Sequence, residues 1–165
     1  MVKTPEGFHT CRIAGDVLRG EIRRLLRQAG DDIPENDILK GTEGENLGFW
    51  TAICSDEEPG RVAAAVRYDR TDWYSCTVKN LATDPEFRKR GLGEAVTRQA
   101  VDKAIDRDGC KVLLADITVG NEGSRRIFED KLGFKVVDEF CWASGEKPAR
   151  IYHTVLKPPV DGRCP

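Results

Sequence analysis

The segment from Leu81 to Gly93 leads from an apolar stretch, through a basic turn that contains glycines, into a helical pattern. Its sequence reads Leu81-Ala82-Thr83-Asp84-Pro85-Glu86-Phe87-Arg88-Lys89-Arg90-Gly91-Leu92-Gly93. The N–H groups at the start of a helix lack partners, the helix dipole favours negative charge there, and glycine lets an anion approach the main chain. Arg88, Lys89 and Arg90 add three cations to this turn. The segment therefore predicts a strand, an anion-binding turn and a helix in succession, and the anion that suits it best is a diphosphate.

This turn matches neither of the two best-known nucleotide-binding loops. A G-x-G-x-x-G loop would need a third glycine where Val96 stands, and the chain contains no G-x-x-x-x-G-K-[ST] sequence. A glycine at a helix start with no ligand is the alternative interpretation of the same residues.

The chain has 165 residues, of which 39% are apolar and 33% are charged. This length and composition predict one compact domain that spans residues 1–165. A formal net charge of −2 argues against a polybasic surface for nucleic acid or anionic lipid. No apolar run approaches the roughly 18 residues that cross a bilayer, and residues 1–15 lack the apolar core of a signal peptide. We therefore expect a soluble, cytoplasmic protein.

The six cysteines are far apart in the sequence, because the two nearest are 22 positions apart and no C-x-x-C pair occurs. Only two histidines are present, so the residue types for a zinc site are scarce. A chain of this length does not need a disulfide framework. We expect reduced, mostly structural thiols and no metal.

The hydrophobic periodicity predicts an α+β protein in which helices cover both faces of a mixed sheet. Short polar turns separate the first three expected strands, which favours an antiparallel meander. The strand, helix and strand that follow predict a right-handed parallel crossover. Helices are expected at residues 17–29, 91–107 and 124–132, and strands at 49–54, 61–68, 73–82, 111–119, 134–143 and 150–156.

Two motifs in this order resemble the GNAT superfamily of acyl-CoA-dependent N-acyltransferases. Residues 88–93 match its R/Q-x-x-G-x-G/A pyrophosphate loop. Residues 121–134 look like its N-x-x-A/S-x-x-[LI]-Y-x-x-x-G-F segment, with one additional residue before Gly133. The resemblance implies a single splayed GNAT domain, an α/β/α sandwich. Its mixed sheet would have six to seven strands, antiparallel except for a parallel fourth and fifth pair.

The resemblance also implies acetyl-CoA as the co-substrate and assigns residues to it. The main chain of Leu81, Ala82 and Thr83 would pair with the pantetheine arm, and Asn121 would hydrogen-bond the same arm. Asn121 as a helix cap and Leu81 as a core residue are the structural alternatives. The pyrophosphate would be held by the loop residues Arg88, Lys89, Arg90, Gly91, Leu92 and Gly93.

Phe128 stands where the family usually has a tyrosine that protonates the departing thiolate. Counting back from Gly133 would instead place Glu129 there, although the aromatic ring favours Phe128. Phenylalanine keeps the packing but has no proton to donate. Ser124, Tyr74 or Tyr152 could replace the tyrosine, or the thiolate could leave without an acid, since a thiol has a pKa near 8.5.

The residue that deprotonates the amine is expected to be a carboxylate. Asp116 lies five positions before Asn121, where some family members that act on protein N-termini carry a glutamate. A carboxylate in an otherwise apolar strand is costly unless it faces a cleft or an ion-pair partner, and the second of these would be a structural role. Glu86 and Asp84 are reserve candidates, each of which equally suits a turn or a helix start.

The predicted function is direct transfer of an acetyl group from acetyl-CoA to a primary amine of a small molecule or protein in a ternary complex. An acyl-CoA-binding sensor with little catalysis is the alternative that Phe128 suggests. A nucleic-acid contact through residues 88–90, Arg125 and Arg126 is disfavoured by the net acidity. Dimers are common in the family, so a homodimer is an open possibility.

Nine acidic residues and a single lysine lie between Asp31 and Glu58. Such a segment either forms a solvated loop or attracts a cationic partner. In the second case it would concentrate a cationic amine acceptor near the site.

Overall fold

The structure is a computed structural model that describes residues 3–11, 15–30, 48–140 and 149–155. Its seven strands are β1 (Phe8–Thr10), β2 (Gly48–Ser55), β3 (Val62–Arg70), β4 (Ser75–Thr83), β5 (Val112–Thr118), β6 (Lys135–Phe140) and β7 (Ala149–Val155). They form one sheet in the order β1-β2-β3-β4-β5-β7-β6. Only β4 and β5 are parallel, which confirms the predicted mixed sheet.

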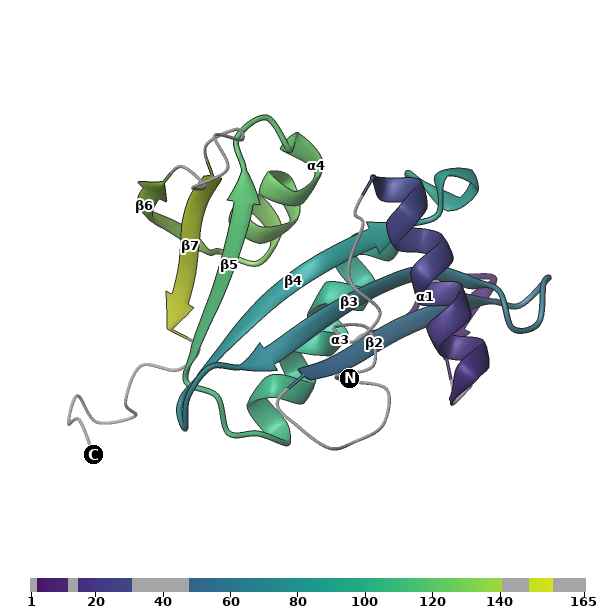
Figure 1. Cartoon of the computed structure of the whole chain (residues 1–165), viewed down its shortest axis with the longest axis horizontal. Helices are drawn as coiled ribbons and strands as arrows, with labels where there is room; N and C mark the ends of the chain where they lie inside the picture. Colours follow the sequence, from purple (N-terminus) through teal and green to yellow (C-terminus); the bar gives the residue numbers. More distant parts are fainter. Residues whose placement is uncertain (1–2, 12–14, 31–47, 141–148, 156–165) are drawn as a thin grey trace.

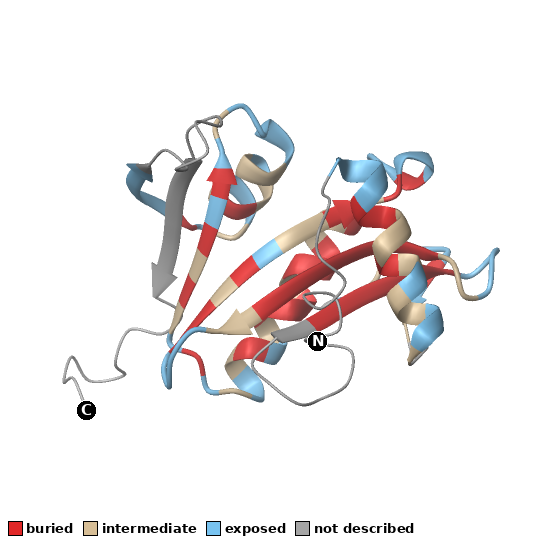
Figure 2. Cartoon of the chain, in the orientation of Figure 1, coloured by how far each residue is buried: buried red, intermediate tan, exposed pale blue. Residues whose placement is uncertain are grey.

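Helices cover both faces of this sheet, as the periodicity predicts (Figure 1). Helix α1 (Asp16–Ala29) packs on one face through Ile22, Leu25 and Leu26. Helix α3 (Leu92–Asp106) packs on the other face, together with α4 (Glu122–Arg125) and its continuation η2 (Arg126–Lys131). The short η1 (Pro85–Phe87) connects β4 to α3. The middle strands are therefore buried along most of their length (Figure 2).

Strands β4 and β5 separate soon after they begin. They pair only at Ser75–Val112, Cys76–Leu113 and Thr77–Leu114, after which the two ribbons diverge (Figure 1). A bulge in β4 also interrupts its pairing with β3, because Lys79 pairs with Arg67 while Ala82 pairs with Ala65. Strand β4 thus carries one residue more than β3 over this interval, and Asn80 has a positive φ of 55°.

The predicted helix at residues 124–132 forms, but its second part is a π-helix. The N–H of Leu132 donates to the carbonyl of Ile127 at 3.0 Å, which is a bond across five residues instead of four. A π-turn holds one residue more than an α-turn, and the segment has one residue more than the pattern that it resembles.

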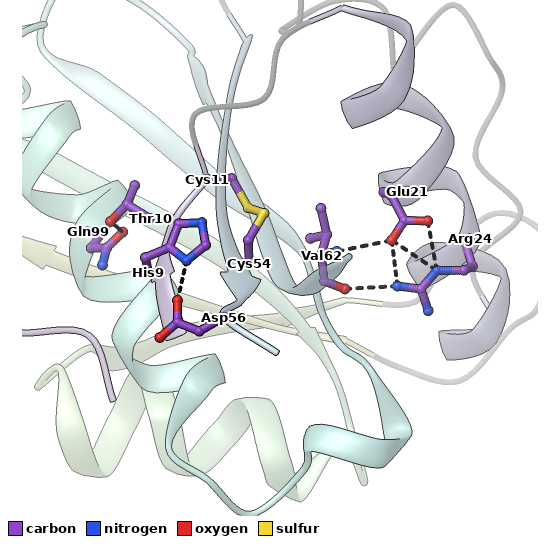
Figure 3. The surroundings of a disulfide bond; sticks show 9 residues. All are labelled: His9, Thr10, Cys11, Glu21, Arg24, Cys54, Asp56, Val62 and Gln99. Carbon is purple, nitrogen blue, oxygen red and sulfur yellow. Dashed lines mark hydrogen bonds and ion pairs between the residues drawn. A yellow bond between two sulfur atoms is a disulfide. The ribbon is translucent and has the colours of Figure 1, made fainter. Parts of the chain in front are cut away.

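Four of the cysteines are paired, so the expectation of reduced thiols is wrong for them. Cys11 bonds to Cys54, and Cys76 bonds to Cys110. Figure 3 shows the first bridge beside β1, where His9 pairs with Asp56. The large sequence separations are closed by strand pairing, which cannot be read from cysteine spacing. Cys141 and Cys164 lie outside the described residues.

None of the described helices is both long enough and apolar enough to span a membrane.

Candidate functional site

The divergence of β4 and β5 leaves a cavity of about 330 Å³ between them, which we call the slot. Its walls come from residues 78–81 of β4, residues 115–118 of β5, and Asn121, Ser124 and Phe128 beyond β5. Val78, Ala115, Ile117 and Phe128 belong to the apolar core on the α3 face. Asp116 and Thr118 alternate with core residues along β5 and therefore point toward the opposite face. The slot thus has one apolar side and one polar side.

Asp116 is exposed at the slot and, among the described residues, has no hydrogen-bond or ion-pair partner. Surrounding protein atoms nevertheless remove part of its hydration, and this desolvation raises the pKa of Asp116. The positive charge of Lys79, which lines the same slot, opposes that rise in pKa. Lys79 itself forms an ion pair with Asp69. An unpaired carboxylate with a raised pKa in a cavity is a candidate general base.

Asn121 and Ser124 lie together at the end of β5. The side-chain Oδ1 of Asn121 accepts a hydrogen bond from the N–H of Ser124 at 3.2 Å and so caps α4. This cap uses the amide oxygen and leaves the amide nitrogen to donate into the slot, which both residues line. The structure therefore gives Asn121 a capping role and a position at the cavity at the same time.

The π-helix determines which residue faces the slot from η2. The ring of Phe128 is 3% exposed, lines the slot and packs edge-on against Phe134 with ring centroids 5.1 Å apart. Glu129 does not line it and accepts a hydrogen bond from Arg125 at 3.2 Å. Phe128, and not Glu129, therefore presents its side chain to the slot.

A second cavity, of about 260 Å³, lies where β4 ends and α3 begins. We call it the basic cavity, because Arg88, Lys89, Arg126 and Lys131 line it. Thr83, residues 91–94 and Ile127 complete its walls. It adjoins the slot through neighbouring residues, since Leu81 lines the slot and Thr83 lines the basic cavity.

The main chain of the basic cavity has the form that an anion requires. Lys89 and Gly91 have φ angles of 63° and 77°, so the loop turns sharply before α3. No side chain caps the helix, and its first N–H groups, from residues 92–94, remain without intrahelical partners. A Cβ at Gly93 would lie 3.0 Å from Cδ1 of Ile127 and 3.4 Å from Oγ1 of Thr83. Glycine at this position thus allows η2 to approach the loop closely.

The third cation of the loop does not face the basic cavity. The guanidinium of Arg90 lies over the rings of Phe87 and Phe8, 5.5 Å and 5.9 Å from their centroids. Ala82 also points away, because it packs in the core beneath α1.

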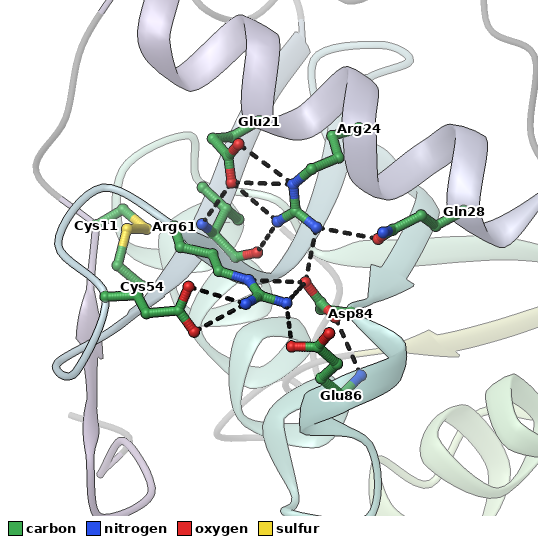
Figure 4. A network of polar contacts seen from close by, with 10 residues as sticks. Cys11, Glu21, Arg24, Gln28, Cys54, Arg61, Asp84 and Glu86 are labelled. Atoms are coloured by element: carbon green, nitrogen blue, oxygen red, sulfur yellow. Dashed lines mark hydrogen bonds and ion pairs between the residues drawn. A yellow bond between two sulfur atoms is a disulfide. The ribbon is translucent and has the colours of Figure 1, made fainter.

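The two reserve carboxylates belong to an ion-pair network at the end of β4 (Figure 4). Asp84 is only 1% exposed and accepts hydrogen bonds from Arg24 at 2.7 Å and from Arg61 at 3.0 Å. Burial disfavours its charge, but hydrogen bonds from Arg24, the Glu86 N–H and Arg61 outweigh burial and lower the pKa of Asp84. Glu86 is bound to Arg61 at 2.6 Å. Neither carboxylate lines the slot or the basic cavity.

Neither tyrosine that could replace the family's acid is seen at the slot. Tyr74 packs edge-on against Trp73 in the β3–β4 turn and does not line the slot. The side chain of Tyr152 lies outside the described residues.

Only the end of the acidic segment is described, in the β2–β3 turn. There Asp56 pairs with His9, and Glu58 pairs with Arg61. Residues 31–47 lie outside the described residues. Within the described ranges, no group of three or more His, Cys, Asp or Glu side chains is placed to hold a metal ion.

Lys79, Thr118 and Lys131 belong to no site that the sequence predicts, and Arg126 belongs only to the disfavoured nucleic-acid contact. Alternation along β4 and β5 could have suggested Lys79 and Thr118. The extra residue before Gly133 was the signal for the altered η2 face that carries Arg126 and Lys131.

Comparison with known proteins gives the family. A model of the acetyltransferase (GNAT) family matches residues 18–134. No curated protein matches the chain in sequence. One similar solved structure is Arabidopsis thaliana NAA60 in complex with acetyl-CoA, at 13% identity and a TM-score of 0.70, covering 90% of this chain and 97% of that one.

Two bacterial enzymes have similar folds. The ribosomal-protein-S18-alanine N-acetyltransferase of Escherichia coli has 17% identity and a TM-score of 0.73, covering 95% of this chain and 99% of its own. The ribosomal-protein-S5-alanine acetyltransferase of Vibrio fischeri has 15% identity and a TM-score of 0.75, covering 93% and 95%. At these identities the likeness shows the fold alone, whereas the family match covers most of the chain. The chain belongs to the acetyltransferase (GNAT) family.

Proposed function

We propose that this protein is an N-acetyltransferase that moves an acetyl group from acetyl-CoA to a primary amine of a small molecule or protein, by direct transfer in a ternary complex. The observation that carries the proposal is that the basic cavity adjoins the slot, where Asp116 has no partner among the described residues. One molecule with phosphates at one end and a thioester at the other fits this arrangement. The structure of NAA60 with acetyl-CoA, which shares the fold, supports the choice of co-substrate.

In this proposal the basic cavity holds the phosphates and the slot holds the pantetheine arm. The N–H groups of residues 92–94 and the cations Arg88 and Lys89 bind the diphosphate. Main-chain groups from Leu81 to Thr83 and the amide of Asn121 bind the arm. The bulge in β4 frees main-chain groups of Asn80 and Leu81 from regular pairing, and their N–H groups can stabilise the carbonyl oxygen of the thioester.

Asp116 acts as the general base on the polar side of the slot. The ammonium form of the acceptor gives one proton to the Asp116 carboxylate, directly or through a water molecule. The neutral amine nitrogen then forms a bond to the acetyl carbon as the carbon–sulfur bond breaks. The sulfur leaves with the electron pair of that bond, and the second proton of the amine passes to that sulfur or to water.

Phe128 cannot protonate the departing sulfur, because its ring has no donor. Ser124, which lines the slot, is the side-chain donor that the proposal assigns to this sulfur. Since a free thiol has a pKa near 8.5, departure as a thiolate is also feasible at neutral pH.

The acceptor is proposed to be cationic before it reacts. The acidic segment between residues 31 and 58 supports this view through its charge alone. We also propose that the transfer is direct and that the protein acts in the cytoplasm.

The test is thiol release from acetyl-CoA across a panel of polyamines, aminoglycosides, amino acids and peptides with free N-termini. We expect turnover on at least one class and a loss of about 100-fold or more in kcat for Asp116→Asn, with CoA affinity retained. Glu86→Gln is the matched comparison and should keep its activity, because Glu86 is bound to Arg61 outside both cavities. Turnover that survives Asp116→Asn would refute the assignment of the base.

A second candidate function, an acyl-CoA sensor, is favoured by the absence of a hydroxyl on the buried ring of Phe128. It predicts tight acetyl-CoA binding without turnover on any amine of the panel.

A further inference from the structure

Four cations line the basic cavity without acidic partners among the described residues, and the carboxylate in the same lining, Glu94, is paired with Arg98 at 2.9 Å. Arg88 and Lys89 come from the loop, and Arg126 and Lys131 come from η2. In the described part of the chain none of these four side chains forms an ion pair. Arg125 is different, although it is the neighbour of Arg126, because it is bound to Glu122 at 2.8 Å and to Glu129 at 3.2 Å. Unneutralised like charges around one cavity favour a polyanionic ligand.

The wide turn of η2 brings Arg126 and Lys131 to the same side. In a regular α-helix each residue advances about 100°, so two residues five apart point about 140° away from each other. The hydrogen bond from Leu132 to Ile127 spans five residues and stacks positions that a regular helix would separate. The carbonyl of Lys131 also accepts a hydrogen bond from Arg98 at 2.7 Å, which attaches the end of this turn to α3.

We propose that Arg126 and Lys131 form a second wall of the phosphate site, opposite the loop of residues 88–93, and that this wall binds a phosphate of acyl-CoA. This inference rests on the proposed function and goes beyond the loop that the sequence motif identifies. Coenzyme A offers two sources of the same chemistry, its diphosphate and the 3′-phosphate on its ribose. Arg126 supplies a planar donor group and Lys131 a compact charge, a pair that suits either source.

The test is calorimetric binding of CoA and of dephospho-CoA, which lacks the 3′-phosphate, at fixed low ionic strength. The variants are Arg126→Ala/Lys131→Ala, the charge-conserving Arg126→Lys/Lys131→Arg, and Arg125→Ala as the control on the same helix. We expect the double alanine variant to bind CoA at least tenfold more weakly, with a shallower dependence on salt. The charge-conserving variant should retain most of the affinity, and Arg125→Ala should stay within about twofold of the wild type.

Dephospho-CoA distinguishes the two phosphates. If affinity falls for CoA alone, the wall binds the 3′-phosphate, and if it falls for both ligands, the wall binds the diphosphate. Both results support the proposal. A double alanine variant that binds CoA like the wild type, or like Arg125→Ala, overturns it while the proposed function stands. Wild-type protein that binds neither ligand overturns the proposed function itself, and circular dichroism of each variant excludes unfolding as the cause of a loss.

Discussion

At the scale of single residues, the proposed chemistry depends on Asp116 and on its incomplete hydration. Desolvation raises the pKa of Asp116, so the carboxyl group becomes protonated at a higher pH than an ordinary aspartate. A protonated carboxyl cannot accept the proton of the amine. We therefore expect kcat to fall on the acid side with an apparent pKa above the ordinary value of about 3.9. The residual kcat of the Asp116→Asn variant should not show this fall at acid pH.

The charged form of Asp116, which the proposed catalysis requires, should lower the stability of the folded protein. A folded-state pKa above the unfolded value means that protonation favours the folded form, and that this contribution is lost as the pH rises through the folded pKa. At pH 7 the charged Asp116 therefore opposes folding. Thermal unfolding should show a Tm for Asp116→Asn at or above that of the wild type, and a lower Tm would mean that the charged carboxylate has a stabilising partner.

Phe128 offers a complementary test of the leaving-group step. Phe128→Tyr places a phenol where the ring already lines the slot, so a proton donor becomes available to the departing sulfur. We expect kcat to rise about tenfold at pH 7. The gain should shrink toward pH 9, where the thiolate is the stable form of CoA. Unchanged kcat at pH 7, with acetyl-CoA affinity preserved, would show that sulfur departure does not limit the reaction.

At the scale of elements, the patterns predict the existence and order of the helices and most strands, because periodicity reflects which face each element buries. Strand β1 is missed because three residues are too few to show an alternation. The wide turn of η2 is missed for another reason. An α-helix and a π-helix bury similar apolar residues, so only the hydrogen bond from Leu132 to Ile127 distinguishes them.

Deleting Asp130 tests whether η2 merely accommodates an extra residue. The deletion leaves Ile127 and Leu132 four positions apart, so their hydrogen bond can close a regular α-turn while Phe128 and Phe134 keep their packing. We expect a folded protein with a Tm at least equal to that of the wild type and with CoA binding retained. Deleting Asp102 from α3 is the control, because it moves the buried residues Ala104 and Val101 out of register and should prevent folding. A large loss of Tm on deleting Asp130 would mean that the wide turn is itself required.

At the scale of the whole molecule, the sequence predicts the mixed sheet and its parallel pair, since short turns favour antiparallel neighbours and an intervening helix favours a crossover. The contacts that assemble the site are not predictable in the same way. Arg24 and Arg61 reach Asp84 from α1 and from the start of β3, across separations of 60 and 23 residues. Such partners share no local pattern, so neither the structural role of Asp84 nor the pairing of the cysteines could be derived from spacing.

The two disulfides occupy different places in this assembly, and this difference leads to a prediction for the entire molecule. Cys76 lies in the short stretch where β4 and β5 still pair, and Cys110 lies two residues before β5. Their bond therefore stabilises the paired stretch of β4 and β5 from which the slot opens. The bond between Cys11 and Cys54 instead joins the region of β1 to β2, at the edge of the sheet.

Replacing either pair by alanine should lower the free energy of unfolding by about 3–4 kcal/mol, because each bond closes a loop of a few tens of residues in the unfolded chain. Urea unfolding, with and without a reducing agent, measures this loss. Only Cys76→Ala/Cys110→Ala should also weaken CoA binding, by a few fold, because the slot widens when the pairing of β4 with β5 is less constrained. Cys11→Ala/Cys54→Ala is the matched control with intact CoA affinity. Equal CoA affinities in the two variants would show that three pairs of strand residues suffice to hold the slot in shape.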